Sequence, residues 1–400
     1  MGKVAKDSID YYVLPNKIMC SAIGIWPPDE EQSFGGRLFV GFRVVFSIAA
    51  VCTIFVPEIM MIAVNWGDLR ILTGVGCVLT TVAQLIFKMI YLIARKERSY
   101  KLYKELRSLW DSSHDSKERQ CYQGLAYIAR NCTIIYHTSG LLTVAVFTVS
   151  AVFDYVKFGQ DNNAANRHLP YDVWYGTDVT DSPGFEIAFA CQVLAASICT
   201  IGVTGLDTTC ATSILHICGQ FRLMCMWISN IGIKINCDSP RTVTTDLIRC
   251  IRHQQRLISA VKDVNNLLTP IIFVQVLTSG IVICLCGFAV LRGTGDDLFK
   301  FIVYLTAVMI QLMFWCWPGE ILIQESLEVG YAVYLNIPWY NMEPACRRQL
   351  LLVILRSQNV CSISALTFRT VCIHSLTTVF NAAASYFTLL RQMEEKAMSK

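Results

Sequence analysis

The stretch FEIAFACQVLAASICTIGVTGLDTTCATSILHI, residues 185–217, decides the fold class of this chain. It contains no proline, and as a helix rising about 1.5 Å per residue it would be roughly 50 Å long. The hydrocarbon core of a bilayer is only about 30 Å thick. The stretch is therefore predicted to cross a membrane and to project beyond it into water.

The composition of the whole chain also indicates an integral membrane protein. Hydrophobic residues make up 54% of the 400 residues, charged residues only 16%, and the mean hydropathy is +0.45. Soluble domains carry about 25% charged residues. The sequence predicts an all-α protein with seven membrane spans, which we place at residues 38–64, 69–94, 131–156, 185–217, 268–291, 298–323 and 365–391.

The loops between these spans differ sharply in Lys and Arg content. Loop 95–126 carries eight and loop 218–267 carries seven, against five in the alternate loops together. Short loops rich in Lys and Arg remain in the cytosol. We therefore expect an inverted topology, with a cytosolic N-terminus and an extracellular C-terminus. This topology argues against a G-protein-coupled receptor, whose N-terminus is external.

The segment TDLIRCIRHQQRLISAVKDVNNLL, residues 245–268, is amphipathic as a helix, and Pro270 after it predicts a kink at the membrane. Such a helix could lie flat on the membrane surface. Alternatively, it could form a cytosolic bundle with the extensions of spans 4 and 6 and the start of span 7. We favour the bundle, because several amphipathic extensions of one membrane domain can bury each other's apolar faces.

The last third of the chain resembles the insect odorant receptor family. The resemblance is carried by Cys316 to Gly319, Glu325-Ser326, Trp339, Arg356-Ser357-Gln358 and the ending Ser385 to Arg391. It implies an odorant-gated, non-selective cation channel, a tetramer formed with the odorant co-receptor around one pore. The chain does not resemble the co-receptor itself, so the resemblance implies a ligand-tuning subunit in the plasma membrane of olfactory sensory neurons. One departure is Asn359-Val360, where the family pattern leads us to expect a proline.

The last span is expected to line the pore. It contains Asn381, Ser385, Thr388 and Gln392, and polar groups in a span usually face protein or water. Burial in the chain's own helix bundle is the alternative. The resemblance favours the pore and implies that the gate is formed by Ser385, Leu389, Gln392 and Met393.

These expectations divide the chain into seven segments. They are a cytosolic N-terminal segment (1–37), spans 1–4 (38–217), a cytosolic helical extension (218–267), spans 5–6 (268–323), a cytosolic anchor segment (324–364), the pore-lining helix (365–393) and a short extracellular tail (394–400).

The resemblance places the odorant pocket among spans 2, 3, 4 and 6, in the outer half of the membrane. Volatile ligands need an apolar cavity with few polar groups. Judged by depth along each span, the candidates are Leu79, Val82, Ala83, Phe147, Ser150, Phe189, Gln192, Tyr304 and Val308. Ordinary helix packing is the alternative role for each of them.

Other classes of function find little support in the sequence. It shows no Ser-His-Asp arrangement, zinc motif or phosphate-binding loop where it could act, so we expect no enzymatic activity, no cofactor and no metal site. A gustatory receptor shares the architecture, but its last helix normally ends in a different motif. A transporter would be expected to show inverted repeats, and no convincing internal repeat is present.

Overall fold

The computed structural model describes residues 8–26, 33–111, 115–158, 168–177, 179–235, 240–292, 296–365 and 369–398. The elements in chain order are α1 (Ile9–Ala22), α2 (Phe34–Val64), α3 (Leu69–Ala94), α4 (Lys96–Asp111), α5 (Ser116–Phe158), α6 (Gly184–Lys234), α7 (Pro240–Arg292), α8 (Asp296–Asn336), a 3-10 turn (Trp339–Asn341), α9 (Pro344–Gln358), the two-residue strands β1 (Ser364–Ala365) and β2 (Arg369–Thr370), and α10 (Ile373–Met398). The chain is almost entirely helical, as the sequence predicts.

Six helices, α2, α3, α5, α6, α7 and α8, are long and apolar enough to cross a membrane among the residues that the structure describes. The seventh expected span is α10, which has 26 residues but is not among these six apolar helices. Large apolar side chains project from α2 into the surroundings, among them Phe34, Phe39 and Phe42. An apolar surface of this kind suits contact with lipid rather than with water.

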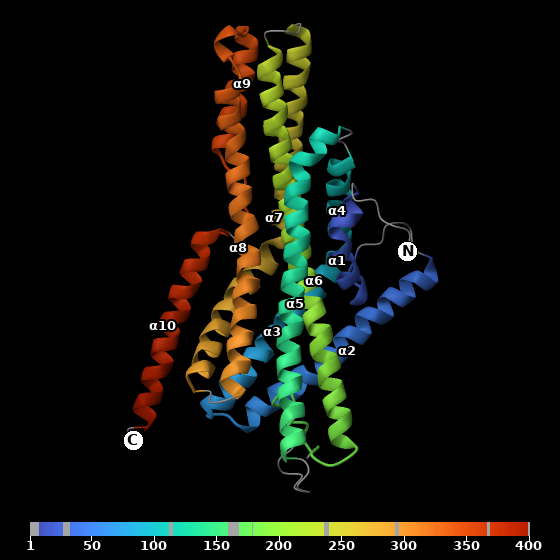
Figure 1. Cartoon of the computed structure of the whole chain (residues 1–400), viewed down its shortest axis with the longest axis vertical. Helices are drawn as coiled ribbons and strands as arrows, with labels where there is room; N and C mark the ends of the chain where they lie inside the picture. Colours follow the sequence, from blue (N-terminus) through green and yellow to red (C-terminus); the bar gives the residue numbers. More distant parts are fainter. Residues whose placement is uncertain are drawn as a thin grey trace.

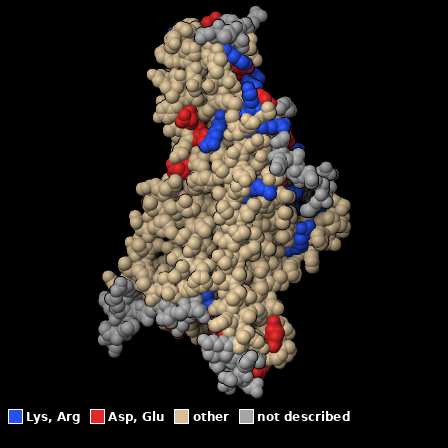
Figure 2. All heavy atoms as spheres, in the orientation of Figure 1, with Lys and Arg blue, Asp and Glu red and all other residues tan. Residues whose placement is uncertain are grey.

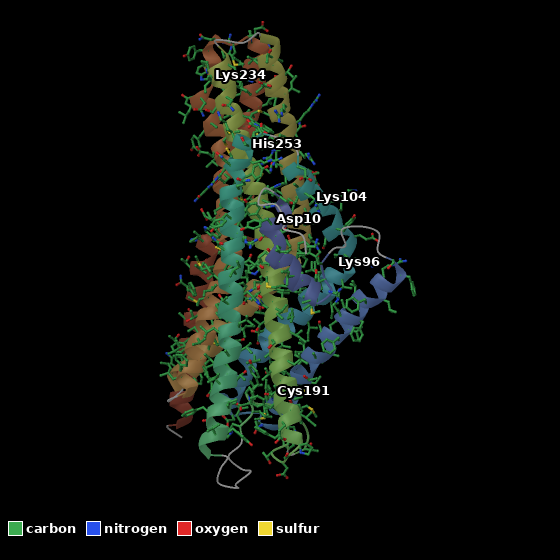
Figure 3. The ribbon with its side chains drawn as sticks, turned by 45° about the vertical axis from the view of Figure 1, so that its right-hand side comes forward. Asp10, Lys96, Lys104, Cys191, Lys234 and His253 are labelled. Atoms are coloured by element: carbon green, nitrogen blue, oxygen red, sulfur yellow. The ribbon has the colours of Figure 1, made fainter. Side chains whose placement is uncertain are left out.

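The longest helices extend well past the thickness of a bilayer. α6 has 51 residues and α7 has 53, so each is on the order of 75–80 Å long. Figure 1 shows α6, α7 and α8 running along the long axis and continuing into a tall bundle that α9 completes. Lys234 lies at the far end of this bundle and Cys191 near the opposite end of the molecule, although both belong to α6 (Figure 3).

The bundle buries one continuous apolar core, to which α6 contributes Phe221, Met224 and Ile228 and α7 contributes Leu257 and Val264. This confirms the helical bundle and excludes a helix lying flat on the membrane. The segment 245–268 is not a separate helix, because α7 continues through Pro270 without interruption. The axis of α7 changes direction about half-way along its length, as Figure 1 shows.

The motifs that carry the family resemblance hold this bundle together. Glu325 on α8 pairs with Arg222 on α6, with 2.5 Å between Oε1 and Nε. The hydroxyl of Ser326 accepts a hydrogen bond from the backbone N–H of Cys361 at 3.0 Å. The hydroxyl of Ser357 on α9 accepts one from the amide of Gln254 on α7, also at 3.0 Å.

The last helix begins later and ends later than the sequence predicted. α10 starts at Ile373, not at 365, and runs to Met398 through most of the expected tail. The chain before it pairs β1 with β2, and the N–H of Val371 donates to the carbonyl of Ile363 at 2.8 Å. These bonds satisfy backbone groups that a helix would otherwise have to pair.

Charged residues are distributed very unevenly along the molecule. Figure 2 shows Lys and Arg gathered over the half of this face that holds the bundle and α4, while the opposite half shows few Lys and Arg and a small group of Asp and Glu near its end. α1 lies beside α4, about half-way along the long axis, and the C-terminal end of α10 lies toward the end of the molecule opposite the bundle (Figure 1). The two ends of the described chain are therefore separated along the long axis.

Candidate functional site

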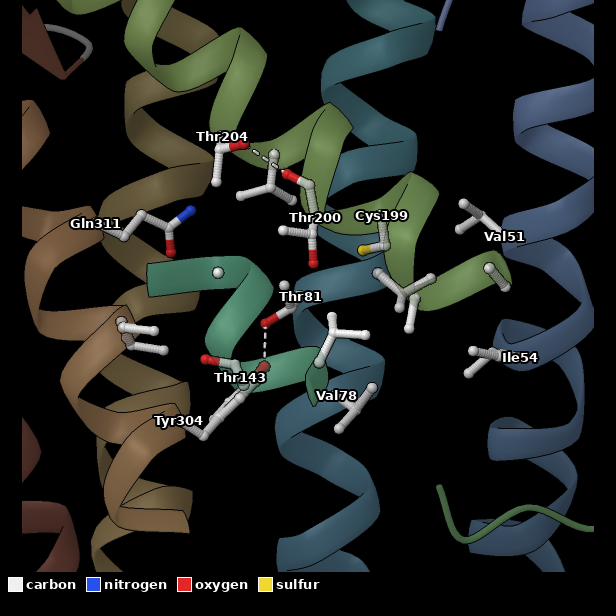
Figure 4. A pocket seen from close by; sticks show the side chains of 18 of the residues that line it. Val51, Ile54, Val78, Thr81, Thr143, Cys199, Thr200, Thr204, Tyr304 and Gln311 are labelled. Atoms are coloured by element: carbon white, nitrogen blue, oxygen red, sulfur yellow. Dashed lines mark hydrogen bonds between the residues drawn. The ribbon is translucent and has the colours of Figure 1, made fainter. Parts of the chain in front are cut away.

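A cavity lies among α3, α5, α6 and α8, with α2 on one side (Figure 4). The volume that the centre of a water molecule can reach inside the cavity is about 100 Å³. Because one water needs roughly 10–15 Å³ of such volume, the cavity has space for several waters. Most of its wall is apolar, formed by valine, isoleucine and alanine side chains. The polar members of the wall are Thr81, Tyr136, Thr143, Tyr171, Cys199, Thr200, Thr204, Tyr304 and Gln311.

Three of the nine pocket residues predicted from the sequence line this cavity. They are Val82 on α3, and Tyr304 and Val308 on α8. Tyr304 reaches across the cavity, because its hydroxyl lies 2.6 Å from that of Thr81 on α3 and 3.1 Å from the carbonyl of Cys77 (Figure 4).

Two more of the predicted residues act on Tyr171, which also lines the cavity. Phe147 stacks on its ring at a centroid distance of 5.2 Å. Gln192 is buried and holds the Tyr171 backbone at both polar groups, because its Oε1 accepts from N–H at 3.0 Å and its Nε2 donates to C=O at 3.1 Å. Gln192 thus anchors the segment between α5 and α6, rather than facing the cavity as the sequence suggested.

The remaining four predicted residues, Leu79, Ala83, Ser150 and Phe189, are not among the residues that line the cavity. Phe189 packs against Phe185 on its own helix, with ring centroids 6.1 Å apart. Depth along a helix had suggested these positions, but depth does not fix which way a side chain faces.

A buried ion pair lies at the inner end of the cavity. Nζ of Lys88 on α3 contacts Oδ1 of Asp207 on α6, and both side chains are 0% exposed. Removing two charges from water is costly, and their attraction offsets that cost only when hydrogen bonds satisfy the remaining donors and acceptors. The surrounding side chains supply those bonds.

Three glutamines from three helices complete the network. Gln275 on α7 accepts from Lys88 Nζ at 2.6 Å and from the amide of Gln84 on α3 at 2.6 Å. Gln311 on α8 donates from Nε2 to Asp207 Oδ2 at 2.8 Å, and the hydroxyl of Tyr136 on α5 lies 3.4 Å from the same oxygen. Five helices therefore meet at one charged pair.

This network was missed by the sequence analysis, although the signal was present. Lys88 and Asp207 are opposite charges inside two apolar spans, and ionisable residues in spans are rare and usually paired. Pairing them would have brought α3 and α6 together at this depth and identified the neighbouring glutamines as their partners.

The predicted gate residues belong to α10. Ser385 and Gln392 are exposed, and the Ser385 hydroxyl donates to the carbonyl of Asn381 at 2.8 Å. The side chains of Leu389 and Met393 lie outside the described part of the structure. At its other end α10 is held by Glu320 of α8, whose Oε2 accepts from the N–H of Ile373 at 3.3 Å. A carboxylate suits this position because the first N–H groups of a helix lack partners within it.

An apolar cavity within a bundle of membrane-spanning helices is typical of a receptor for small apolar molecules. Comparison with known proteins agrees with this class. The family model described as 7tm Odorant receptor matches residues 69–384. The chain therefore belongs to the odorant receptor family, as its last third indicated.

Relatives match along nearly the whole chain. Odorant receptor 22c of Drosophila melanogaster is 24% identical over 392 residues, covering 95% of this chain and 96% of its own. Odorant receptor 13a of the same species is 25% identical and covers 96% and 97%. The structure of the olfactory receptor OR5 from Machilis hrabei in complex with eugenol superposes with a TM-score of 0.79 at 14% identity, over 96% of this chain and 97% of that one.

Membership of this family has three direct consequences. The chain is a receptor and not an enzyme, it crosses the membrane several times, and its helices share the fold of OR5. The sequence predictions on these points are confirmed.

Proposed function

We propose that this chain is a ligand-tuning subunit of an odorant-gated, non-selective cation channel. The observation that carries the proposal is the apolar cavity among α3, α5, α6 and α8 in a chain of the odorant receptor family. Odorants enter this cavity and contact Val82, Tyr304 and Val308, while Phe147 and Gln192 support the wall through Tyr171. The channel is a tetramer formed with the odorant co-receptor in the plasma membrane of olfactory sensory neurons.

The exposed face of α10 supports a pore at this helix. Thr377, Asn381, Ser385, Thr388 and Gln392 are all exposed and recur every three or four residues, which places them on one face. A polar stripe is costly against lipid but favourable against water. In the proposed channel this stripe faces the pore, and Leu389 and Met393 lie at its edge as gate residues.

The distribution of charge supports the inverted topology. The bundle, α4 and the start of α5 hold most of the Lys and Arg, and such regions remain in the cytosol. In the proposed orientation the bundle is cytosolic, α10 ends outside, and the cavity opens nearer the outer surface. A gustatory-type channel shares this arrangement, but the odorant receptor model matches this chain.

The test is a whole-cell recording from cells that express this chain together with the co-receptor. Odour-evoked cation current should appear with both subunits, be absent with the co-receptor alone, and persist when G-protein signalling is blocked. A response that G-protein inhibitors abolish would contradict the channel. Epitope tags at both ends, stained in intact and permeabilised cells, test the topology independently.

A further inference from the structure

The polar groups around the cavity have an unequal supply of donors and acceptors. Asp207 is a carboxylate paired with Lys88, so its oxygens can only accept hydrogen bonds. Gln311 must therefore present its Nε2 donors to Asp207, with 2.8 Å between Nε2 and Oδ2. The ion pair thus fixes the orientation of the Gln311 amide, which at other sites would be ambiguous.

The same constraint leaves the Gln311 carbonyl oxygen available. Its Nε2 is used by Asp207 and approaches Oε1 of Gln84 at 3.4 Å. Its own Oε1 accepts no hydrogen bond from any side chain that the structure describes, and Gln311 lines the cavity. Figure 4 shows Gln311 extending from α8 at the edge of the cavity with its nitrogen and oxygen pointing in different directions.

The hydroxyl donors of Thr81, Tyr304 and Tyr136 in the wall are occupied. Thr81 and Tyr304 lie 2.6 Å apart, and both are in reach of the Cys77 carbonyl, at 3.3 Å and 3.1 Å respectively. Whichever hydroxyl donates to the other, both hydrogens are used and an oxygen lone pair remains. Tyr136 likewise directs its hydrogen to Asp207.

The threonines of α5 and α6 mostly bond to their own helices. Thr143 donates to the carbonyl of Ser139 at 3.1 Å, and Thr204 donates to that of Thr200 at 2.7 Å. The hydroxyls of Thr200 and Tyr171 are exceptions, since neither donates to any of the described residues. These two hydroxyls can donate to a ligand, while Oε1 of Gln311 is an acceptor that no described side chain uses.

From the unused Gln311 oxygen we infer that the cavity selects small apolar ligands that carry one hydroxyl donor, namely alcohols and phenols. The hydroxyl donates to Oε1 of Gln311, and the hydrocarbon body packs on the valine, isoleucine and alanine side chains. The inference rests on the proposed function, in which this cavity is the odorant site. An ether or ester of the same shape brings only acceptors and leaves the buried Gln311 oxygen unpaired, which is unfavourable. An amine would arrive as a cation, and burying a charge in an apolar wall is costlier still.

The test compares matched ligands that differ only in the donor. Phenol, benzyl alcohol and hexanol are paired with anisole, benzyl methyl ether and hexyl methyl ether. Binding is measured as the ligand-dependent rise in unfolding temperature of the purified full chain in nanodiscs, and gating as current in cells with the co-receptor. One hydrogen bond to a buried acceptor corresponds to about a tenfold preference for each alcohol over its ether.

Two substitutions in the cavity wall identify the acceptor. Gln311→Met removes Oε1 at nearly constant length, so it should weaken the alcohols about tenfold while leaving the ethers within about twofold. Val308→Ala, one turn away on the same helix, should weaken alcohols and ethers alike because it removes only apolar contact. Tyr304→Phe leaves Thr81 to donate to Cys77 and should reduce the preference less than Gln311→Met does.

The two measurements separate this inference from the proposed function. Ethers that bind as tightly as their alcohols, or no binding of either, would overturn the inference whether or not odorants evoke current. A preference for alcohols that survives Gln311→Met would also overturn it. Alcohol-selective binding without current would support the inference and contradict the channel. If Gln311→Met fails to fold, Tyr304→Phe decides the question: the alcohol preference should persist in this variant, and its loss would assign the acceptor to Tyr304 and overturn the inference.

Discussion

Breaking the ion pair between Lys88 and Asp207 should destabilise the receptor more than any single change on its surface. Replacing Lys88 by Met leaves the Asp207 carboxylate buried with Gln311 and Tyr136 as its remaining donors. Removing one partner of a buried pair typically costs about 3–5 kcal/mol. The whole free energy of unfolding of a domain is on the order of 5–15 kcal/mol. The Lys88→Met variant should therefore lose much of its thermal stability and surface expression.

An independent route leads to a similar magnitude. A buried carboxyl left without its lysine can be neutralised by a proton, and at pH 7 this costs about 4 kcal/mol, because an ordinary aspartic acid has a pKa near 3.9. Acidification to pH 5.5 lowers that cost by about 2 kcal/mol. The Lys88→Met variant should consequently recover stability relative to the parent as the pH falls.

The double variant Lys88→Met with Asp207→Leu should be more stable than either single variant. It removes both charges, while Gln84 can still donate to Gln275, at 2.6 Å in the parent. Replacing a whole buried pair by apolar residues is often nearly neutral. Lys234→Gln is the matched control, because the Lys234–Asp246 pair is solvent-accessible, with side chains 46% and 31% exposed. That change should cost no more than about 1 kcal/mol.

The assay is thermal unfolding of fluorescently tagged receptor, followed by gel filtration after heating and repeated across pH. The reasoning is refuted if Lys88→Met is as stable as the parent, or if the double variant loses the sum of the two single losses. Recovery of Lys88→Met in acid distinguishes an uncompensated charge from a simple packing defect, which would show no such pH dependence.

Three further predictions follow from other sites. Burial, reinforced by the charges of Arg256 and Arg249, lowers the pKa of His253 in the bundle to about 4. Because this pKa is below the ordinary value near 6.5, the contribution of neutral His253 to stability is full above pH 6.5 and is lost as the pH falls toward 4. In the same thermal assay, the His253→Gln variant should therefore lose about 2 kcal/mol less stability between pH 8 and pH 5 than the parent does. Gln192→Leu leaves the N–H and C=O of Tyr171 unpaired, so odour sensitivity should fall severalfold at matched surface expression, with an unchanged response arguing against the anchor. In the proposed pore Leu389→Ser should raise the basal current, because a ring of leucine excludes water from a closed gate. If the basal current and the odour sensitivity of the variant both equal those of the parent, Leu389 is not at the gate.

The sequence predicted most of the fold because each span carries its own signal. Residues 185–217 are apolar, lack proline and exceed a bilayer in length, and α6 indeed runs from Gly184 far beyond it to Lys234. The boundaries near 365 were missed for a local reason, since β1 and β2 are only two residues each and pair with one another. The hydrophobicity of the sequence alone does not reveal two strands as short as these.

The cavity was harder to predict, because a pocket forms between helices and its lining depends on how each helix is rotated about its own axis. Of the residues suggested by depth along each span, Val82, Tyr304 and Val308 line the cavity, whereas Leu79 and Ala83 do not. On α3 a lining residue, Val82, is thus directly followed by one that does not line the cavity. Without a fixed rotation for each helix, side chains at the same depth cannot be assigned to the cavity or to the neighbouring packing interface.

The buried ion pair indicates how these helices are rotated about their own axes. Helices in a membrane gain little from the hydrophobic effect when they associate, so interhelical polar contacts help to set which faces meet. Lys88, Asp207 and Gln311 mark the inward faces of α3, α6 and α8. Seven residues earlier on each helix, two turns and about 10 Å along its axis, are Thr81, Thr200 and Tyr304, and all three line the cavity. The charged network and the cavity therefore share one set of helix faces, and the position of the wall follows from the position of the charges.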